Sequence, residues 1–154
     1  MQKLQSVVTQ LEIKLANAEN INSAISKSSV GWHIEHSLIT INLIIDAVKN
    51  STPKNYKWKF NTARLFVFTF NHIPRGKGKA PKIVQPKDDF TVVSIRERLL
   101  IAKEKINELE RLSKNNYFKH PYLGDLNLKA TEIFLVIHTK HHLAIINDII
   151  KSVK

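Results

Sequence analysis

Apolar residues recur every three or four positions along most of this chain, and that spacing limits the folds it can adopt. The first such stripe consists of Leu4, Val7, Val8, Leu11 and Leu15. Side chains with this spacing lie on one face of an α-helix, whereas a half-buried strand alternates apolar and polar residues. No alternating segment competes with this pattern. The sequence therefore predicts an all-α fold in which helices bury their apolar stripes against one another.

Five helices are expected from the stripes and from the residues at their ends. The predicted ranges are 2–17, 29–49, 61–73, 94–114 and 128–152. Ser28 and Ser29 are suitable N-caps for the second helix. Ser94 followed by Glu97 has the spacing of a capping box at the start of the fourth. The segment "NNYFKHPYLGDLN", which precedes the last helix, is predicted to be a turn region.

Length and composition are those of one globular domain, predicted to span residues 1–154. Hydrophobic residues make up 43% of the chain, and the absence of cysteine excludes disulfides and thiolate metal sites. No uncharged apolar run approaches the length needed to cross a bilayer, and the N-terminal residues lack the pattern of a signal peptide. We therefore expect a cytoplasmic protein with no membrane partner.

The formal net charge of +11 raises the question of an anionic partner. Much of the basic charge lies in "PKNYKWKF" and in "PRGKGKAPKIVQPK", which is rich in proline and glycine. The second stretch has neither helical nor strand periodicity, so it predicts an exposed basic loop between the third and fourth helices. Residues 75–87 of this loop could clamp an anion, but a solvated loop is the simpler explanation. No recognisable nucleic-acid-binding motif accompanies the charge, so nucleic acid is not expected as a partner.

The stretch "FLVIHTKHHLAII" places three histidines in the last predicted helix. At about 100° per residue, His138 and His142 lie one turn apart in the middle of the apolar stripe, while His141 lies at its edge near Asp148, which we expect to support it. Two histidines at positions i and i+4 can present two nitrogens to one metal ion. Alternatively, each ring is buried, neutral and hydrogen-bonded to a carbonyl or hydroxyl group. A zinc site needs at least a third protein ligand.

A third ligand is expected from the second predicted helix, which contains His33 and His36. Glu35, Asn42, Asp46 and Lys49 share a narrow polar sector of this helix, which we expect to face water. Both histidines lie outside that sector, so periodicity allows either to point inward and does not choose between them. If Glu35 faces solvent, no general base is evident beside the site.

Three separated motifs carry a resemblance to a known family. They are "GWHIEH" in a helix that begins at a serine, "FKHPYLGDL", and "HTKHHLAIINDI" near the end of the chain. In this order they resemble the DinB-like (YfiT-like) superfamily, and more closely an uncharacterised bacterial subfamily with an HP-x-x-G turn and a final H-x-x-HH helix. Where that subfamily often has a tryptophan after the glycine turn, this chain has "LNLKATEIF".

The resemblance implies a four-helix bundle that holds a divalent metal through three histidines. The family's pattern places one ligand seven residues after the capping serine, which selects His36, and the other two at His138 and His142. His33 falls where the family usually has an apolar residue, and His141 is not usually a ligand. His120 is expected to fix the turn through hydrogen bonds, and it could instead flank the site.

The implied function is a metal-dependent enzyme, either a thiol-dependent transferase or a hydrolase, acting on a small molecule. Its cofactor would be zinc, nickel or iron, a low-molecular-weight thiol is a possible partner, and a homodimer is plausible for such bundles. Two alternatives remain from other classes. One is a metal-binding or interaction protein without turnover, and the other is a basic nucleic-acid-associated protein.

Overall fold

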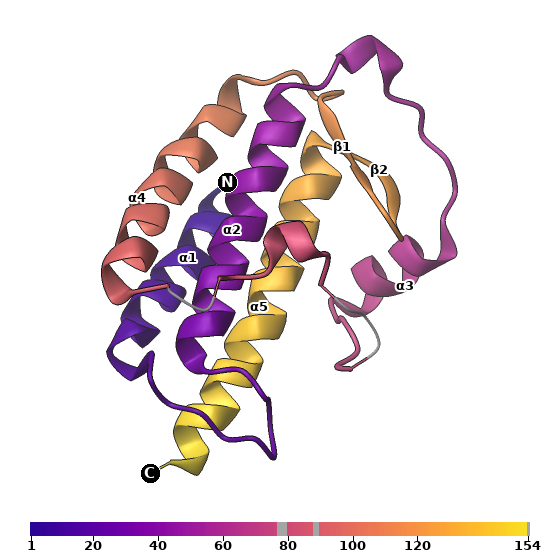
Figure 1. The fold of residues 1–154 in the computed structure, drawn as a ribbon. Helices are drawn as coiled ribbons and strands as arrows, with labels where there is room; N and C mark the ends of the chain where they lie inside the picture. Colours follow the sequence, from indigo (N-terminus) through magenta and orange to yellow (C-terminus); the bar gives the residue numbers. More distant parts are fainter. Residues whose placement is uncertain (77–79, 88–89, 154) are drawn as a thin grey trace.

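The computed structural model describes residues 1–76, 80–87 and 90–153, and within them the protein is mostly helical (Figure 1). The helices are α1 Gln2–Ile13, α2 Val30–Lys49, α3 Thr62–Phe70, α4 Val92–Glu108 and α5 Leu128–Ser152. Short 3₁₀ turns are η1 Lys14–Asn17, η2 Pro53–Asn55, η3 Lys82–Val84 and η4 Leu109–Arg111. Two strands, β1 Tyr117–His120 and β2 Gly124–Asn127, form an antiparallel hairpin. The predicted all-α class is therefore confirmed in its broad form.

Four helices share one hydrophobic core. α2 packs against both α4 and α5, and α1 packs against the same two helices, whereas α3 lies at the outer edge of the molecule beside the hairpin (Figure 1). The largest fully buried side chains come from all four core helices and from the segments that follow α4. They are Leu4, Leu11, Ile34, Leu38, Ile41, Ile45, Ile95, Leu99, Ile106, Leu109, Leu126 and Leu135.

Polar side chains fix where the helices begin. The Ser29 hydroxyl accepts a hydrogen bond from the Trp32 amide, so α2 starts where the sequence predicts. In α4 the capping box consists of Thr91 and Ser94, each of which accepts from the backbone amide of the other. The predicted box at Ser94 and Glu97 was therefore wrong by one turn, because a threonine hydroxyl already satisfies the first free amides.

Three predicted helices end differently in the structure. α4, which was predicted to span residues 94–114, runs from Val92 to Glu108 and continues only as the 3₁₀ turn η4. The first predicted helix continues to Asn17, but its last turn is the 3₁₀ turn η1. α3 stops at Phe70, before the predicted end, because Asn71 adopts the left-handed conformation with φ 48° and ψ 37°. Asparagine tolerates this conformation better than most residues, and it ends the helix there. His72 consequently lies beyond the helix.

The segment predicted as a turn region forms the β1–β2 hairpin. Its buried residues Phe118 and Leu126 face one another across the two strands. Gly124 adopts a φ of 72°, which suits glycine. The His120 Nδ1 atom accepts hydrogen bonds of 3.1 Å from the amides of Tyr122 and Leu123. His120 therefore fixes this turn, as predicted.

The polar sector of α2 faces water only toward its C-terminal end, at Asp46 and Lys49, whereas the whole sector was predicted to face water. Glu35 is 2% exposed and Asn42 is 7% exposed, because α4 covers this side of the helix. The Arg98 Nε–H group donates to Glu35, and Lys105 reaches Asp46 at 2.6 Å. A charged partner on the neighbouring helix thus allows a carboxylate to be buried that periodicity alone assigns to the surface.

By length and mean hydropathy alone, α5 could cross a membrane, which differs from the prediction that no segment approaches that length. Its most apolar window has a mean hydropathy of 1.2, and 56% of that window is buried inside the protein. A long core helix of a protein that does not span a membrane can have the same length and mean hydropathy. The burial follows from the contacts of α5 with α1 and α2.

Candidate metal centre

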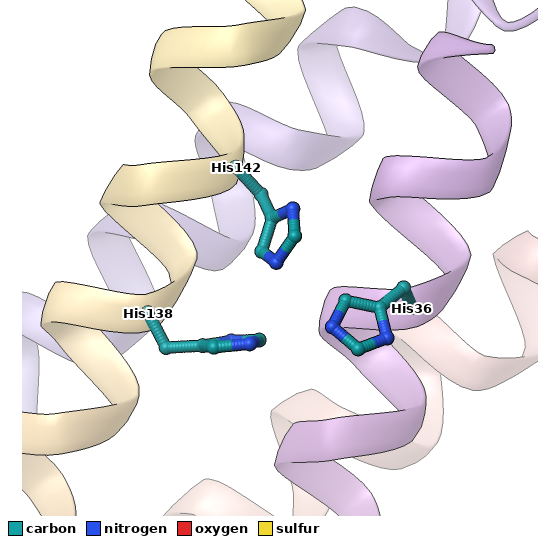
Figure 2. A group of neighbouring side chains, drawn as sticks. All are labelled: His36, His138 and His142. Atoms are coloured by element: carbon teal, nitrogen blue, oxygen red, sulfur yellow. The ribbon is translucent and has the colours of Figure 1, made fainter. Parts of the chain in front are cut away.

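Three histidine side chains from α2 and α5 meet between these helices. One potential ligand nitrogen from each of His36, His138 and His142 lies within 4.8 Å of the other two. The imidazole rings point toward a common space, with His36 facing the pair from α5 (Figure 2). The ring centroids of His138 and His142 are 4.7 Å apart, as the one-turn spacing on a single helix face predicts.

A backbone carbonyl fixes the orientation of His36. The Nδ1 atom of His36 lies 2.8 Å from the Val84 oxygen, which belongs to η3. Because a carbonyl oxygen can only accept, Nδ1 must carry the proton, and Nε2 then has a free lone pair. The Trp32 ring stacks on His36 with centroids 5.1 Å apart and further limits rotation of the imidazole.

His33 contacts the centre through His142. The two Nδ1 atoms are 3.0 Å apart, and the Nε2 atom of His33 lies 2.9 Å from the Ser26 hydroxyl. If His142 uses Nε2 as a ligand atom, its Nδ1–H group donates to His33, whose Nε2–H group then donates to Ser26. One set of tautomers thus satisfies the whole chain of contacts. His33 therefore supports a neighbouring ring and is absent from the group of three.

His138 has the least satisfied ring of the three. Its buried Nδ1 atom has no hydrogen-bond partner among the described residues. An unpaired polar atom in a core costs a few kcal/mol, and such a cost usually has a compensating ligand, water or ion. A cation coordinated by this ring would satisfy one of its nitrogens.

Burial keeps these imidazoles neutral. It lowers the pKa of His138 and of His142 well below the usual value near 6.5, and the other histidines nearby lower both further. Burial also lowers the pKa of His36, although the Val84 carbonyl acts in the opposite direction. For His33, burial and then the neighbouring His36 lower the pKa to about 4. Neutral imidazoles are the form in which histidine binds metals.

The three residues fit a divalent cation by chemistry and by distance. Zinc–nitrogen bonds of ~2.1 Å in tetrahedral geometry place the nitrogens roughly 3.4 Å apart. The observed limit of 4.8 Å means that small ring movements would bring all three nitrogens into bonding range. Three protein ligands leave at least one position for water or substrate, which is the arrangement of catalytic zinc sites.

The side chains around His141 differ from the prediction. Asp148 pairs with Arg75 at 2.8 Å, where we expected it to support His141. A hollow of about 220 Å³ next to His141 is lined also by His72, Arg75 and Lys140, but not by His36, His138 or His142. Among the described residues of the 75–87 loop, Arg75 lines this hollow. Residues 77–79 of the loop lie outside the described residues.

Sequence reasoning did not find the Val84 carbonyl or the Ser26 hydroxyl. Val84 contacts His36 and Ser26 contacts His33, and both belong to segments between the long helices. Helical periodicity does not predict which atoms of such segments contact a helix. The chain matches no protein-family model, no curated protein and no solved structure. The resemblance to the DinB-like superfamily therefore stays a prediction that depends on the three motifs.

Proposed function

We propose that the protein is a metal-dependent enzyme in which His36, His138 and His142 hold one divalent cation within a four-helix bundle of DinB-like type. The observation that carries this proposal is the convergence of three buried, neutral imidazole groups from two helices. Zinc, nickel and iron all suit such nitrogen ligands. When bound, the cation would act as a Lewis acid toward a coordinated oxygen or sulfur atom.

The protein's own residues would hold and orient this cation. The Val84 carbonyl keeps the Nε2 lone pair of His36 available, and His33 limits rotation of His142. A small-molecule substrate with an anionic group would contact Arg75 and Lys140, which line the hollow next to His141. A low-molecular-weight thiol as second substrate is an implication of the family resemblance. Residues 1–154 acting as one domain, a homodimer and a cytoplasmic location belong to the same proposal.

Metal content tests the proposal directly. Tag-free protein would be incubated with Zn²⁺, Ni²⁺ or Fe²⁺, desalted, and measured by elemental mass spectrometry. We expect about one equivalent of one metal in the native protein and a loss of most of it in His138→Ala. His72→Ala is the matched control, because it removes an exposed histidine outside the group of three. Equal metal contents in both variants would contradict the site.

Turnover separates an enzyme from a metal-binding protein without activity. Metal-loaded protein would be screened with small electrophiles and common bacterial thiols, with His138→Ala as the blank. Reaction that requires both the metal and His138 supports the enzyme. Retention of one equivalent of metal with no reaction across the screen would favour the non-catalytic alternative.

A further inference from the structure

The basic charge of the chain is concentrated in one segment. Residues 47–87 contain ten of the 24 lysine and arginine residues and none of the 13 acidic residues. The rest of the chain is therefore nearly neutral, although the formal net charge is +11. Lys54, Lys57 and Lys59, which lie in the part that leads into α3, are all exposed.

The same segment exposes large apolar side chains. Trp58 and Phe60 precede α3, and Leu65, Phe66 and Phe70 lie on it; we call these five residues the aromatic surface. Trp58 is 66% exposed and Phe70 is 64% exposed. α3 has no buried residue, and it lies at the outer edge of the molecule (Figure 1). Five exposed large apolar side chains within 13 residues of sequence favour an interaction site on this segment.

The aromatic surface is held in place by contacts within the protein. Arg64 lies over the Trp58 ring at 5.7 Å and donates to the carbonyl of Asp125 in β2. Phe66 and Phe70 are in contact with ring centroids 4.8 Å apart. The Asn61 amide donates to the Tyr122 carbonyl in the hairpin turn. Contacts with the hairpin therefore fix α3 and the segment that leads into it.

Charge selects among the possible partners. A second copy of the chain would bring two strongly basic segments together, which like-charge repulsion disfavours. Single-stranded nucleic acid usually lies in a basic groove in which bases stack on aromatic rings. None of the five residues lines the hollow at Glu35 and Arg98 or the hollow at His141 in the described structure. An anionic bilayer suits an outer helix that exposes Phe and Leu and is preceded by exposed Trp58 and lysines, because rings enter the interface while ammonium groups contact phosphates.

We infer that the aromatic surface and its flanking lysines dock the protein peripherally on an anionic lipid membrane. The expectation of no membrane partner was based on the lengths of apolar runs, which bear only on segments that span the bilayer. Peripheral docking needs no such segment, and it is independent of the proposed metal centre. It adds a location at which the proposed enzyme would meet its substrates.

Vesicle binding tests this inference. Full-length protein would be sedimented with phosphatidylcholine vesicles and with vesicles that also contain about 30 mol % phosphatidylglycerol. We expect binding to the anionic vesicles only, and weaker binding at high salt. Phe66→Ser with Phe70→Ser should reduce partitioning by at least about tenfold. Lys54→Gln, Lys57→Gln and Lys59→Gln together should reduce it by about fivefold per residue.

Matched variants control for general effects. Leu100→Ser removes an apolar residue of similar exposure from α4, and Lys3→Gln, Lys114→Gln and Lys151→Gln together remove three exposed charges outside the basic segment. Both controls should bind as wild type does. Trp58→Phe should keep binding but lose the blue shift of tryptophan fluorescence that the vesicles induce.

Several results would overturn the inference. They are no binding to anionic vesicles, equal binding to neutral vesicles, and equal losses in the test and control variants. Dimerisation that is abolished by Phe66→Ser with Phe70→Ser, seen by sedimentation velocity without vesicles, would assign the aromatic surface to a second copy. Tighter binding to a single-stranded oligonucleotide than to anionic vesicles would assign it to nucleic acid.

Discussion

At the scale of single residues, the contact between the Nδ1 atoms of His33 and His142 couples two rings that have different roles. Only one of two nitrogens 3.0 Å apart can carry the shared proton. If His142 binds metal through Nε2, His33 must accept from it. The Ser26 hydroxyl oxygen, which lies 2.9 Å from the His33 Nε2 atom, then accepts a hydrogen bond from the His33 Nε2–H group. His33 thereby acts as a positioning residue.

Replacement of His33 tests this role. We expect His33→Phe to lower zinc affinity by about 10- to 100-fold, because His142 loses the acceptor that fixes its tautomer and ring orientation. His33→Asn should recover most of the affinity, since its Oδ1 atom can accept at a similar position. Affinity would be measured by competition with a chromophoric chelator. Equal affinities in His33→Phe and wild type would contradict the role.

The residues of the centre differ in how far sequence could identify them. Helical periodicity alone placed His138 and His142 on one buried face, and the structure brings them together. Periodicity left His33 and His36 equivalent, and only the family resemblance selected His36. The partners that distinguish them, Val84 and Ser26, lie in loops, so their positions depend on tertiary packing that no local pattern encodes.

At the scale of elements, the contact between α2 and α4 includes a carboxylate that has little access to water. Burial raises the pKa of Glu35, while the Arg98 charge acts in the opposite direction. Removal of Arg98 would leave that carboxylate without its cation. The second Glu35 oxygen is buried and has no partner among the described residues, so nothing else at this position compensates the charge.

We expect Arg98→Leu to lower the free energy of unfolding by about 1–2 kcal/mol at pH 7. This figure is below that for a fully buried pair, because the Arg98 side chain is 45% exposed. Since a raised carboxyl pKa costs stability above the unfolded value, the loss should grow as pH rises through the range above 4.5. Glu35→Gln combined with Arg98→Leu should restore stability in urea titrations. A double variant no more stable than Arg98→Leu would contradict the argument.

The hairpin shows why one element was missed while α5 was predicted at both ends. Signals for α5 are local: an Asn127 cap and 25 residues of helical periodicity. Each strand of the hairpin has only four residues, too few for alternation to stand out. Its turn is held by His120, which was predicted to fix the turn through hydrogen bonds.

The hairpin turn should be sensitive to acid. Burial lowers the pKa of His120 to about 4 in the folded protein, where its Nδ1 atom accepts hydrogen bonds from two amides. The unfolded chain therefore binds the proton first, and stability should fall as pH drops from about 6.5 toward 4. His120→Asn keeps an acceptor that does not titrate, so its unfolding midpoint should depend less on pH over that range. An unchanged pH dependence in His120→Asn would count against this assignment.

At the scale of the whole molecule, the core accommodates imidazoles at the contact between its two most apolar helices. The rings of His36, His138 and His142 replace aliphatic packing where α2 and α5 meet. The described structure satisfies some of their nitrogens with protein atoms and leaves His138 Nδ1 without a partner. A cation at this position would join the two helices, so metal binding and folding stability should be linked.

The linkage predicts a measurable thermal shift. At a free zinc concentration about 100 times the dissociation constant, a ligand of the native state adds about 2.7 kcal/mol, which corresponds to a rise in Tm of roughly 5–10 °C for a chain of this size. Chelator-stripped protein would be compared with reloaded protein by calorimetry. His72→Ala should show the wild-type shift, whereas His138→Ala should show little, with circular dichroism confirming that the variant is folded. An equal shift in folded His138→Ala would mean that the stabilising ion binds elsewhere. No shift in wild type would mean that the imidazoles serve packing alone, because an ion that joins α2 to α5 cannot leave the unfolding equilibrium unchanged.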